Sequence, residues 1–242
     1  MDKKLHIANS QIIFSYDRNL NIRRRLFEFE DYLKGEFKTP FRSVAIPDEI
    51  DPNIPRFESQ SLNNFSKLQV SQNRIILATT YNDAYKYDFL KVKEYINNKC
   101  SLLSSLAKKE NINFIAYIVE LGLHMDVSQI NSFLKDNTGV KAIKDGCRDF
   151  SLFYSQEHLE KFYLNIKCSK FTEKELIFHK ESKTLRPTEN IKYGISTLLD
   201  INTRLYFEKN KKFDKSLYSK IEEETFNIIN TKNIKDFLQG NI

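Results

Sequence analysis

The sequence predicts an α+β protein with two antiparallel β-sheet halves, each covered by a long helix. Runs in which apolar and polar side chains alternate occur in both halves of the chain, and short turn-like stretches separate them. Each half also contains one long helical pattern, at residues 85–110 and from residue 217 onward. Strands and helices do not alternate regularly, which disfavours a parallel βα repeat. We divide the chain into residues 1–139 and 140–242, two halves of one compact unit.

The composition favours a stable globular fold. The chain has 242 residues, of which 40% are hydrophobic and 29% charged, so it can bury most of its apolar surface. Its three Cys lack a paired spacing, which argues against a disulfide framework. No apolar run approaches the roughly 20 residues of a membrane-spanning helix, and no signal-peptide pattern is present. We therefore expect a soluble, cytoplasmic protein without membrane contact.

The first half begins with a strand at residues 5–16, where apolar side chains alternate with polar ones. A helix is predicted between Asn19 and Gly35, because apolar residues recur there at steps of three and four. Four prolines from Pro40 to Pro55 exclude a helix, so this stretch should run as an extended surface segment.

Residues 56–80 read as a β-meander, and residues 85–110 as the clearest helix of the chain. A buried strand at 112–125 and a short helix at 127–137 complete this half. The predicted inward face of the long helix consists of Phe89, Val92, Ile96, Cys100, Leu103 and Ala107.

The second half is expected to start with a connection at residues 140–160. Alternation at 164–168 and 176–178 predicts a hairpin around a turn at 172–174. The remaining expected elements are a long strand at 191–207, a helix at 217–228 and a short terminal helix at 234–238. Within the long strand, Asp200 and Asn202 share one face, which is either a site or simply the solvent side.

Arg23, Arg24 and Arg25 form the densest basic cluster. On a helix, three consecutive residues spread over about 200°, so at least one must approach the buried face. The cluster is a candidate for nucleic-acid or phosphate contact, and the alternative is a solvated helix face. A second candidate cluster, in a predicted loop, consists of Lys209, Lys211 and Lys212. The net charge of +6 is dispersed along the chain, so it adds little support for a nucleic-acid partner.

Residues able to bind a metal are present but poorly spaced. The ladder Cys147, His158, Cys168 and His179 lacks the close pairs of ligands that are typical of zinc sites. His6 and His124 are isolated in the sequence. We assign no metal ligand, no cofactor and no catalytic residue.

A second constellation could suit magnesium chemistry. Nuclease sites use acids to hold the metal and a Lys to stabilise charge. The acids concerned lie near Lys67 and are Asp48, Glu49, Asp51 and Glu58. The alternative is a solvated, Pro-rich loop.

The chain resembles a sporadically distributed family of uncharacterised bacterial proteins. The resemblance covers nearly the whole chain and involves Ile12 to Tyr16, Pro47 to Ser59 with Pro55-Arg56-Phe57, Leu68 to Ile75, and Asp200-Ile201-Asn202 with the helix through Phe226. It supplies no catalytic residues. Sporadic distribution implies mobile genetic islands, where defence and toxin–antitoxin modules are common.

These observations favour a non-enzymatic binding or accessory subunit of a bacterial protein complex, in a setting such as an anti-phage defence or other mobile-island system. Its partner would be another protein or a second copy of the chain, with at most weak nucleic-acid contact. The alternatives are a nucleic-acid-binding module that uses the two basic clusters, and a metal-dependent nuclease that uses the acids near Lys67.

Overall fold

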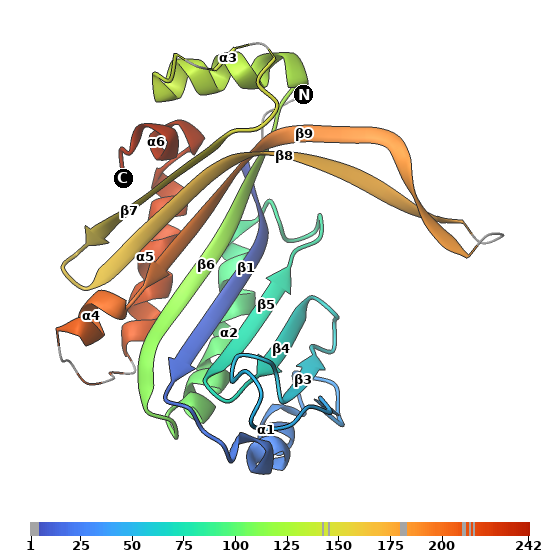
Figure 1. Ribbon diagram of the computed structural model, residues 1–242, viewed down its shortest axis with the longest axis vertical. Helices are drawn as coiled ribbons and strands as arrows, with labels where there is room; N and C mark the ends of the chain where they lie inside the picture. The colour runs from blue at the N-terminus through green and yellow to red at the C-terminus, as the bar shows by residue number, and fades with distance from the viewer. Residues whose placement is uncertain are drawn as a thin grey trace.

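The computed structural model describes residues 5–141, 143–144, 146–179, 183–209, 212, 214 and 216–242, with the backbone alone at residues 175, 176, 178, 179 and 185–190. Figure 1 shows the arrangement of its elements. The strands are β1 (Leu5–Tyr16), β2 (Arg42–Ser43), β3 (Phe57–Gln60), β4 (Ser66–Val70), β5 (Arg74–Thr80), β6 (Ile112–His124), β7 (Ser151–His158), β8 (Phe162–His179) and β9 (Thr184–Asn202). The helices are η1 (Ile22–Arg25, a 3-10 helix), α1 (Leu26–Leu33), α2 (Phe89–Ala107), α3 (Val127–Thr138), α4 (Arg204–Glu208), α5 (Ser216–Thr231) and α6 (Ile234–Gln239).

A single antiparallel sheet of nine strands runs through the molecule, in the order β2-β3-β4-β5-β1-β6-β9-β8-β7. Strand β6 joins the two halves of the chain, because its residues from Ala116 to His124 pair with β9 from Asn202 to Gly194. The prediction of two sheet halves, each covered by its own long helix, is therefore wrong. Alternation along a strand shows which side chains share a face, but not which strand lies alongside. The sequence carries no local signal for the pairing of β6 with β9.

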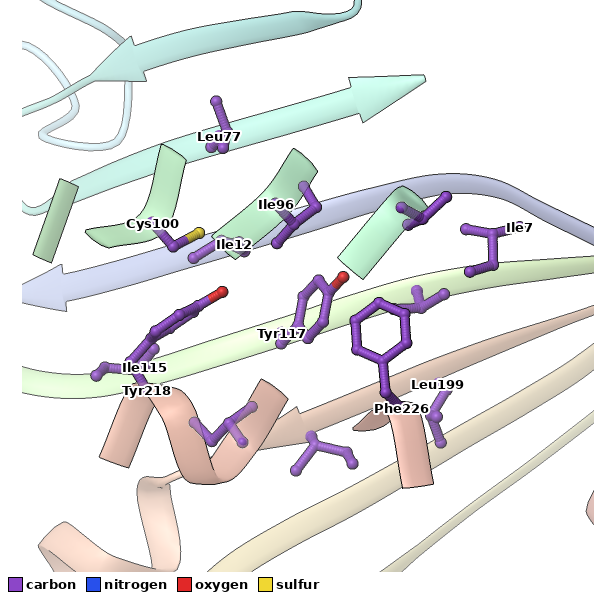
Figure 2. Packing of buried hydrophobic residues seen from close by; sticks show 14 of the residues in the cluster. Ile7, Ile12, Leu77, Ile96, Cys100, Ile115, Tyr117, Leu199, Tyr218 and Phe226 are labelled. Carbon is purple, nitrogen blue, oxygen red and sulfur yellow. The ribbon is translucent and has the colours of Figure 1, made fainter. Parts of the chain in front are cut away.

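Helices α2 and α5 lie on the same face of this sheet and contact each other (Figure 1). Figure 2 shows side chains of both helices packing with Ile12, Tyr117 and Leu199 of the sheet. The predicted inward face of α2 is confirmed, with Phe89 partly buried and five residues fully buried: Val92, Ile96, Cys100, Leu103 and Ala107. Burying a large apolar side chain contributes roughly 1.5–3 kcal/mol, so this layer dominates the stability of the fold.

Local hydrogen bonds set the ends of the helices. The Asp88 side chain accepts a hydrogen bond from the Lys91 backbone N–H at 3.1 Å and caps α2. The helix therefore starts later than the predicted residue 85. Helix α3 ends at Thr138, one residue beyond the prediction, and its C-cap Gly139 has a φ of 66°, in the left-handed region that Gly adopts easily.

The N-terminal elements follow the predictions closely. Strand β1 has the predicted bounds, and β3, β4 and β5 form the predicted meander. The helix expected after Asn19 begins as the 3-10 turn η1 and continues as α1, burying Ile22, Phe29 and Leu33. The Pro-rich segment contains no helix among its residues 40–55, as expected, and contributes the two-residue strand β2.

The C-terminal strands differ from the predictions. Strand β8 continues through the predicted turn at residues 172–174 and pairs with β9 out to His179 and Thr184. The two strands leave the body as a long arm (Figure 1). Thr172, Glu173 and Lys174 are all exposed, so the arm lacks the one-sided apolar alternation by which a strand is recognised.

Two further predictions are corrected in this region. The expected connection at 140–160 contains β7, which forms the edge of the sheet. The strand expected at 191–207 is β9, which starts earlier and ends at Asn202, after which Arg204 begins α4.

The division predicted between residues 139 and 140 falls between α3 and β7, and the sheet itself is continuous across it. In the described part of the chain, no helix has both the length and the apolar character that a bilayer crossing requires.

Candidate functional site

Arg23 fastens the Pro-rich segment to the body. Its Nε donates to Asp48 Oδ1 at 2.8 Å, and its Nη atoms donate to the backbone carbonyls of Val44 at 3.0 Å and Ile46 at 2.6 Å. The guanidinium thus holds residues 44–48 against η1 through these hydrogen bonds. Most donors of the Arg23 guanidinium are therefore used within the protein, although the side chain is 27% exposed.

Arg25 is also engaged within the protein, but by different partners. It forms an ion pair with Glu28 at 2.9 Å and another with Glu110, and it donates to the Leu106 carbonyl at 3.0 Å. Its hydrogen bond lowers the pKa of Glu28 to about 2. Arg24 is exposed and has no side-chain hydrogen bond among the described residues. The three arginines thus point to different surroundings and do not form one binding surface.

The structure describes two of the three lysines of the second basic cluster. Lys209 Nζ donates to the Glu160 carbonyl at 3.1 Å, beside the turn between β7 and β8. Lys212 is exposed, and Lys211 lies outside the described residues.

The acids of the nuclease hypothesis are separated and compensated by basic side chains. Asp48 accepts hydrogen bonds from Arg23 and from the fully buried Arg56, and the bond from Arg23 lowers its pKa. Glu58 instead pairs with Lys67 at 2.9 Å and with Arg42.

The two remaining acids add nothing to a joint site. Asp51 accepts a hydrogen bond from the Asn53 backbone N–H at 2.9 Å, and Glu49 is exposed. Within the described ranges, no three His, Cys, Asp or Glu side chains gather as metal ligands would.

The Cys and His ladder is dispersed over different elements. Cys168 is buried against Thr197, with 3.3 Å between Sγ and Oγ1, and burial raises the pKa of its thiol. Cys147 Sγ contacts the Asp149 carbonyl at 3.1 Å, and His158 Nε2 lies 2.8 Å from Glu224. The side chain of His179 lies outside the described residues.

His6 and His124, isolated in the sequence, meet in the structure. Their rings stack with centroids 4.8 Å apart at the base of the arm. His124 also contacts the ring of Phe171 and lies 3.2 Å from Glu173. These contacts connect β1, β6 and β8 where the arm leaves the sheet.

One face of the sheet lies opposite α2 and α5, and we call it the open face. Figure 1 shows that no helix covers it over β1, β6, β9 and β8. Its side chains alternate along each strand with those of the core. The central open-face residues are Asn9, Gln11, Ile13 and Ser15 of β1, Phe114, Ala116, Ile118 and Glu120 of β6, Leu198, Asp200 and Asn202 of β9, and Asn165 and Lys167 of β8.

Polar rows cross the open face from strand to strand. Ser155 Oγ donates to Asn165 Oδ1 at 2.6 Å, and Asn165 Nδ2 donates to Asp200 Oδ2 at 3.0 Å. Farther along, Asn9 Nδ2 donates to Glu120 Oε2 at 2.8 Å. Cross-strand pairs of this kind hold polar groups in fixed positions on a sheet.

An apolar patch lies beside these rows, where register brings Ile13 opposite both Ile76 and Ala116, next to Ile118. At one end of this patch is a hollow of about 280 Å³. Strands β1, β6 and β9 form its floor, and Asn53 and Asn73 from neighbouring loops line its side.

Two arginines lie at this hollow. The Arg204 guanidinium lies 4.3 Å from the centroid of the Phe114 ring, and Arg74 hydrogen-bonds Asn53. Asp200 and Asn202, which the sequence singled out, are part of the lining. The arginines were missed, because Arg204 was expected inside a strand and Arg74 follows a turn. The surface is suited to hydrogen bonding, ion pairing and apolar contact.

Comparison with models of protein families and with curated protein sequences finds no match for this chain.

Proposed function

We propose that this protein is a binding subunit that recognises a protein partner with the open face of its sheet. The observation that carries the proposal is that helices cover one face of the sheet and leave the other uncovered. Helices α2 and α5 close one face, whereas the other presents ordered polar rows beside an apolar patch. Protein interfaces combine apolar contact with a moderate number of well-placed hydrogen bonds, and the open face offers both.

The charge pattern favours a protein over a nucleic acid. Basic side chains on the open face, such as Lys167 and Arg74, alternate with acidic ones, such as Glu120 and Asp200. A nucleic-acid surface would need a continuous positive stripe along the phosphate backbone. Since Arg23 and Arg25 are also engaged internally, the nucleic-acid module of the sequence analysis has less support.

Exposed apolar side chains on the open face strengthen the case. Phe153 of the edge strand β7 is 65% exposed, and Leu198 of β9 is 37% exposed. Lys167 of β8 lies between them in register. One apolar side chain therefore lies on each side of a basic residue. This arrangement suits contact with a protein partner whose surface has both apolar and acidic groups. Membership of a bacterial complex, such as a defence system, is part of the proposal and depends on the family resemblance alone.

Site-specific photo-cross-linking in the native host tests the proposal. Benzoylphenylalanine would replace Leu198 or Phe153 on the open face, and Leu90 or Phe27 as matched controls. Leu90 of α2 and Phe27 of α1 are 70% and 77% exposed but lie on helices. We expect one defined protein adduct from the two open-face positions only, identified by mass spectrometry.

The outcomes separate the hypotheses. An adduct with a second copy of the chain would identify the partner as the protein itself. A nuclease-sensitive adduct would replace the proposal with a nucleic-acid module. Equal adducts from Leu90, or none from either open-face position, would refute it.

A further inference from the structure

We infer that the hollow on the open face is a recognition site for a carboxylate side chain of the partner, held between Arg74 and Arg204. This inference rests on the proposed function and names the chemistry that the partner must present. The hollow is lined by both guanidiniums, and neither forms an ion pair within the described residues.

Arg74 offers a donor that the protein leaves unused. Its Nη2 donates to Asn53 Oδ1, which also accepts a hydrogen bond from Asn73 Nδ2 at 2.9 Å. Its Nε is buried and has no hydrogen-bond partner in the described part of the protein. A buried N–H without an acceptor costs free energy, and an incoming carboxylate oxygen would remove that cost. The bond to Asn53 meanwhile fixes the orientation of the guanidinium.

Arg204 is positioned by an aromatic ring. Its guanidinium carbon lies over Phe114, 4.3 Å from the ring centroid, and its side chain makes no hydrogen bond to another described residue. The N–H donors of this guanidinium, which match the geometry of a carboxylate, are not used by hydrogen bonds to the described residues. The contact with Phe114 restrains the arginine before a ligand arrives, which reduces the entropy lost on binding.

The charge of the lining favours a monoanion. Arg74 and Arg204 contribute two positive charges and Asp200 one negative charge, so the lining carries one net positive charge. Asp200 accepts hydrogen bonds from Asn165 at 3.0 Å and Asn202 at 3.2 Å, which fix its position in the lining. A phosphate group carries more negative charge than a carboxylate, so Asp200 would repel it more strongly.

The size and floor of the hollow also favour a side chain. Its volume of about 280 Å³ is at the lower limit of the roughly 300–1,000 Å³ of typical small-molecule and cofactor sites. Ile13, Ala116 and Ile118 supply an apolar floor for the methylene groups of an aspartate or glutamate. The site thus fits one acidic residue that projects from a partner lying across the open face.

NMR of the arginine Nε–H groups tests the inference directly. The probe is an acetylated and amidated hexaglutamate peptide, with hexaglutamine, inorganic phosphate and a single-stranded oligo(dT) as comparisons. We expect hexaglutamate to shift the Nε–H signals of Arg74 and Arg204 in a saturable way. The double variant Arg74→Gln/Arg204→Gln should weaken binding at least tenfold. The control Lys235→Gln, at an exposed basic residue of helix α6 outside the open face, should change it less than twofold.

Three results would overturn the inference. They are equal binding of hexaglutamine, unchanged binding by a double variant that remains folded, and tighter binding of phosphate or oligo(dT) than of hexaglutamate. The last would indicate a nucleic-acid ligand. A protein adduct at Leu198 without hexaglutamate binding would leave the proposed function standing and remove only the carboxylate site. Hexaglutamate binding without any adduct would support the carboxylate site and refute the proposed function.

Discussion

The two faces of the sheet are built from the same strands but have different physical roles. Leu198 and Leu199 are neighbours in β9, yet Leu199 is fully buried under the helices while Leu198 is 37% exposed on the open face. On the covered face, apolar side chains interlock with α2 and α5. On the open face, polar side chains hydrogen-bond across strands and cationic groups remain available. The comparison teaches that a step of one residue along a strand moves a side chain from the core, which supports stability, to the face that we propose for recognition.

The adjacent leucines give the largest expected difference between the faces. Leu199→Ala should lower the free energy of unfolding by about 2–5 kcal/mol, because it leaves a cavity beneath the helices. Leu198→Ala should cost less than about 1 kcal/mol, because the truncated side chain is partly solvated already. Urea unfolding of both variants measures the difference. Equal losses would contradict the assignment of faces.

A buried carboxyl on the covered face predicts a pH-dependent stability. Glu222 of α5 is 3% exposed, its Oε1 has no hydrogen-bond partner among the described residues, and burial raises its pKa to about 7. Lys93 opposes this increase and Glu223 adds to it. The other titratable groups around Glu222 are Cys100, Tyr117 and Tyr218, and burial keeps them neutral by raising their own pKa values.

Because the folded pKa of Glu222 lies above the unfolded value, its protonated form is favoured in the fold. Its contribution is complete at low pH and is lost as the pH rises from about 4.5 to about 7, a change of about 3 kcal/mol. Glu222→Gln should remove this part of the pH dependence. Urea unfolding at about pH 4.5 and about pH 8 measures it. Glu223→Gln, at an exposed position, is the matched control. A variant with the wild-type pH dependence would refute the assignment.

The three consecutive arginines allow a second comparison, between side chains engaged within the protein and an exposed one. Arg23→Gln and Arg25→Gln should each cost about 1–3 kcal/mol, because they leave carbonyls or carboxylates without their donors. Arg24→Gln should change the unfolding free energy by less than about 0.5 kcal/mol. Chemical denaturation gives all three values. A polyanion complex abolished by Arg24→Gln alone would restore a functional role for the cluster.

The sequence predicted individual elements well where the pattern was local. The alternation along β1 and the inward face of α2 follow directly from burial on one side. The arm was missed, because a two-stranded ribbon such as that around Glu173 has no covered face and hence no alternation. The single sheet was missed, because the pairing of β6 with β9 joins segments about 80 residues apart with no local signal.

The candidate site was only partly predictable for the same reason. Asp200 and Asn202 share a strand face and could be noticed from their spacing. Arg74, Phe114 and Arg204 lie on three different elements, and only the order β5-β1-β6-β9 brings them to one hollow. Conversely, Arg23 looked like a ligand contact because its acceptors are backbone carbonyls, which leave no trace in the sequence.

The smallest expected effect concerns the polar row on the open face. Asn165 joins Ser155 to Asp200 through hydrogen bonds of 2.6 Å and 3.0 Å. Because these groups are partly solvated, water replaces much of what a truncation removes, so Asn165→Ala should cost only about 0.5–1.5 kcal/mol. The exposed Gln11→Ala, on the same face, should cost less than about 0.5 kcal/mol. A double-mutant cycle of Asn165→Ala with Ser155→Ala should show a coupling near 0.5 kcal/mol. A loss for Asn165→Ala as large as that for Leu199→Ala would mean that the open face also carries the fold, and the separation of roles between the two faces would not hold.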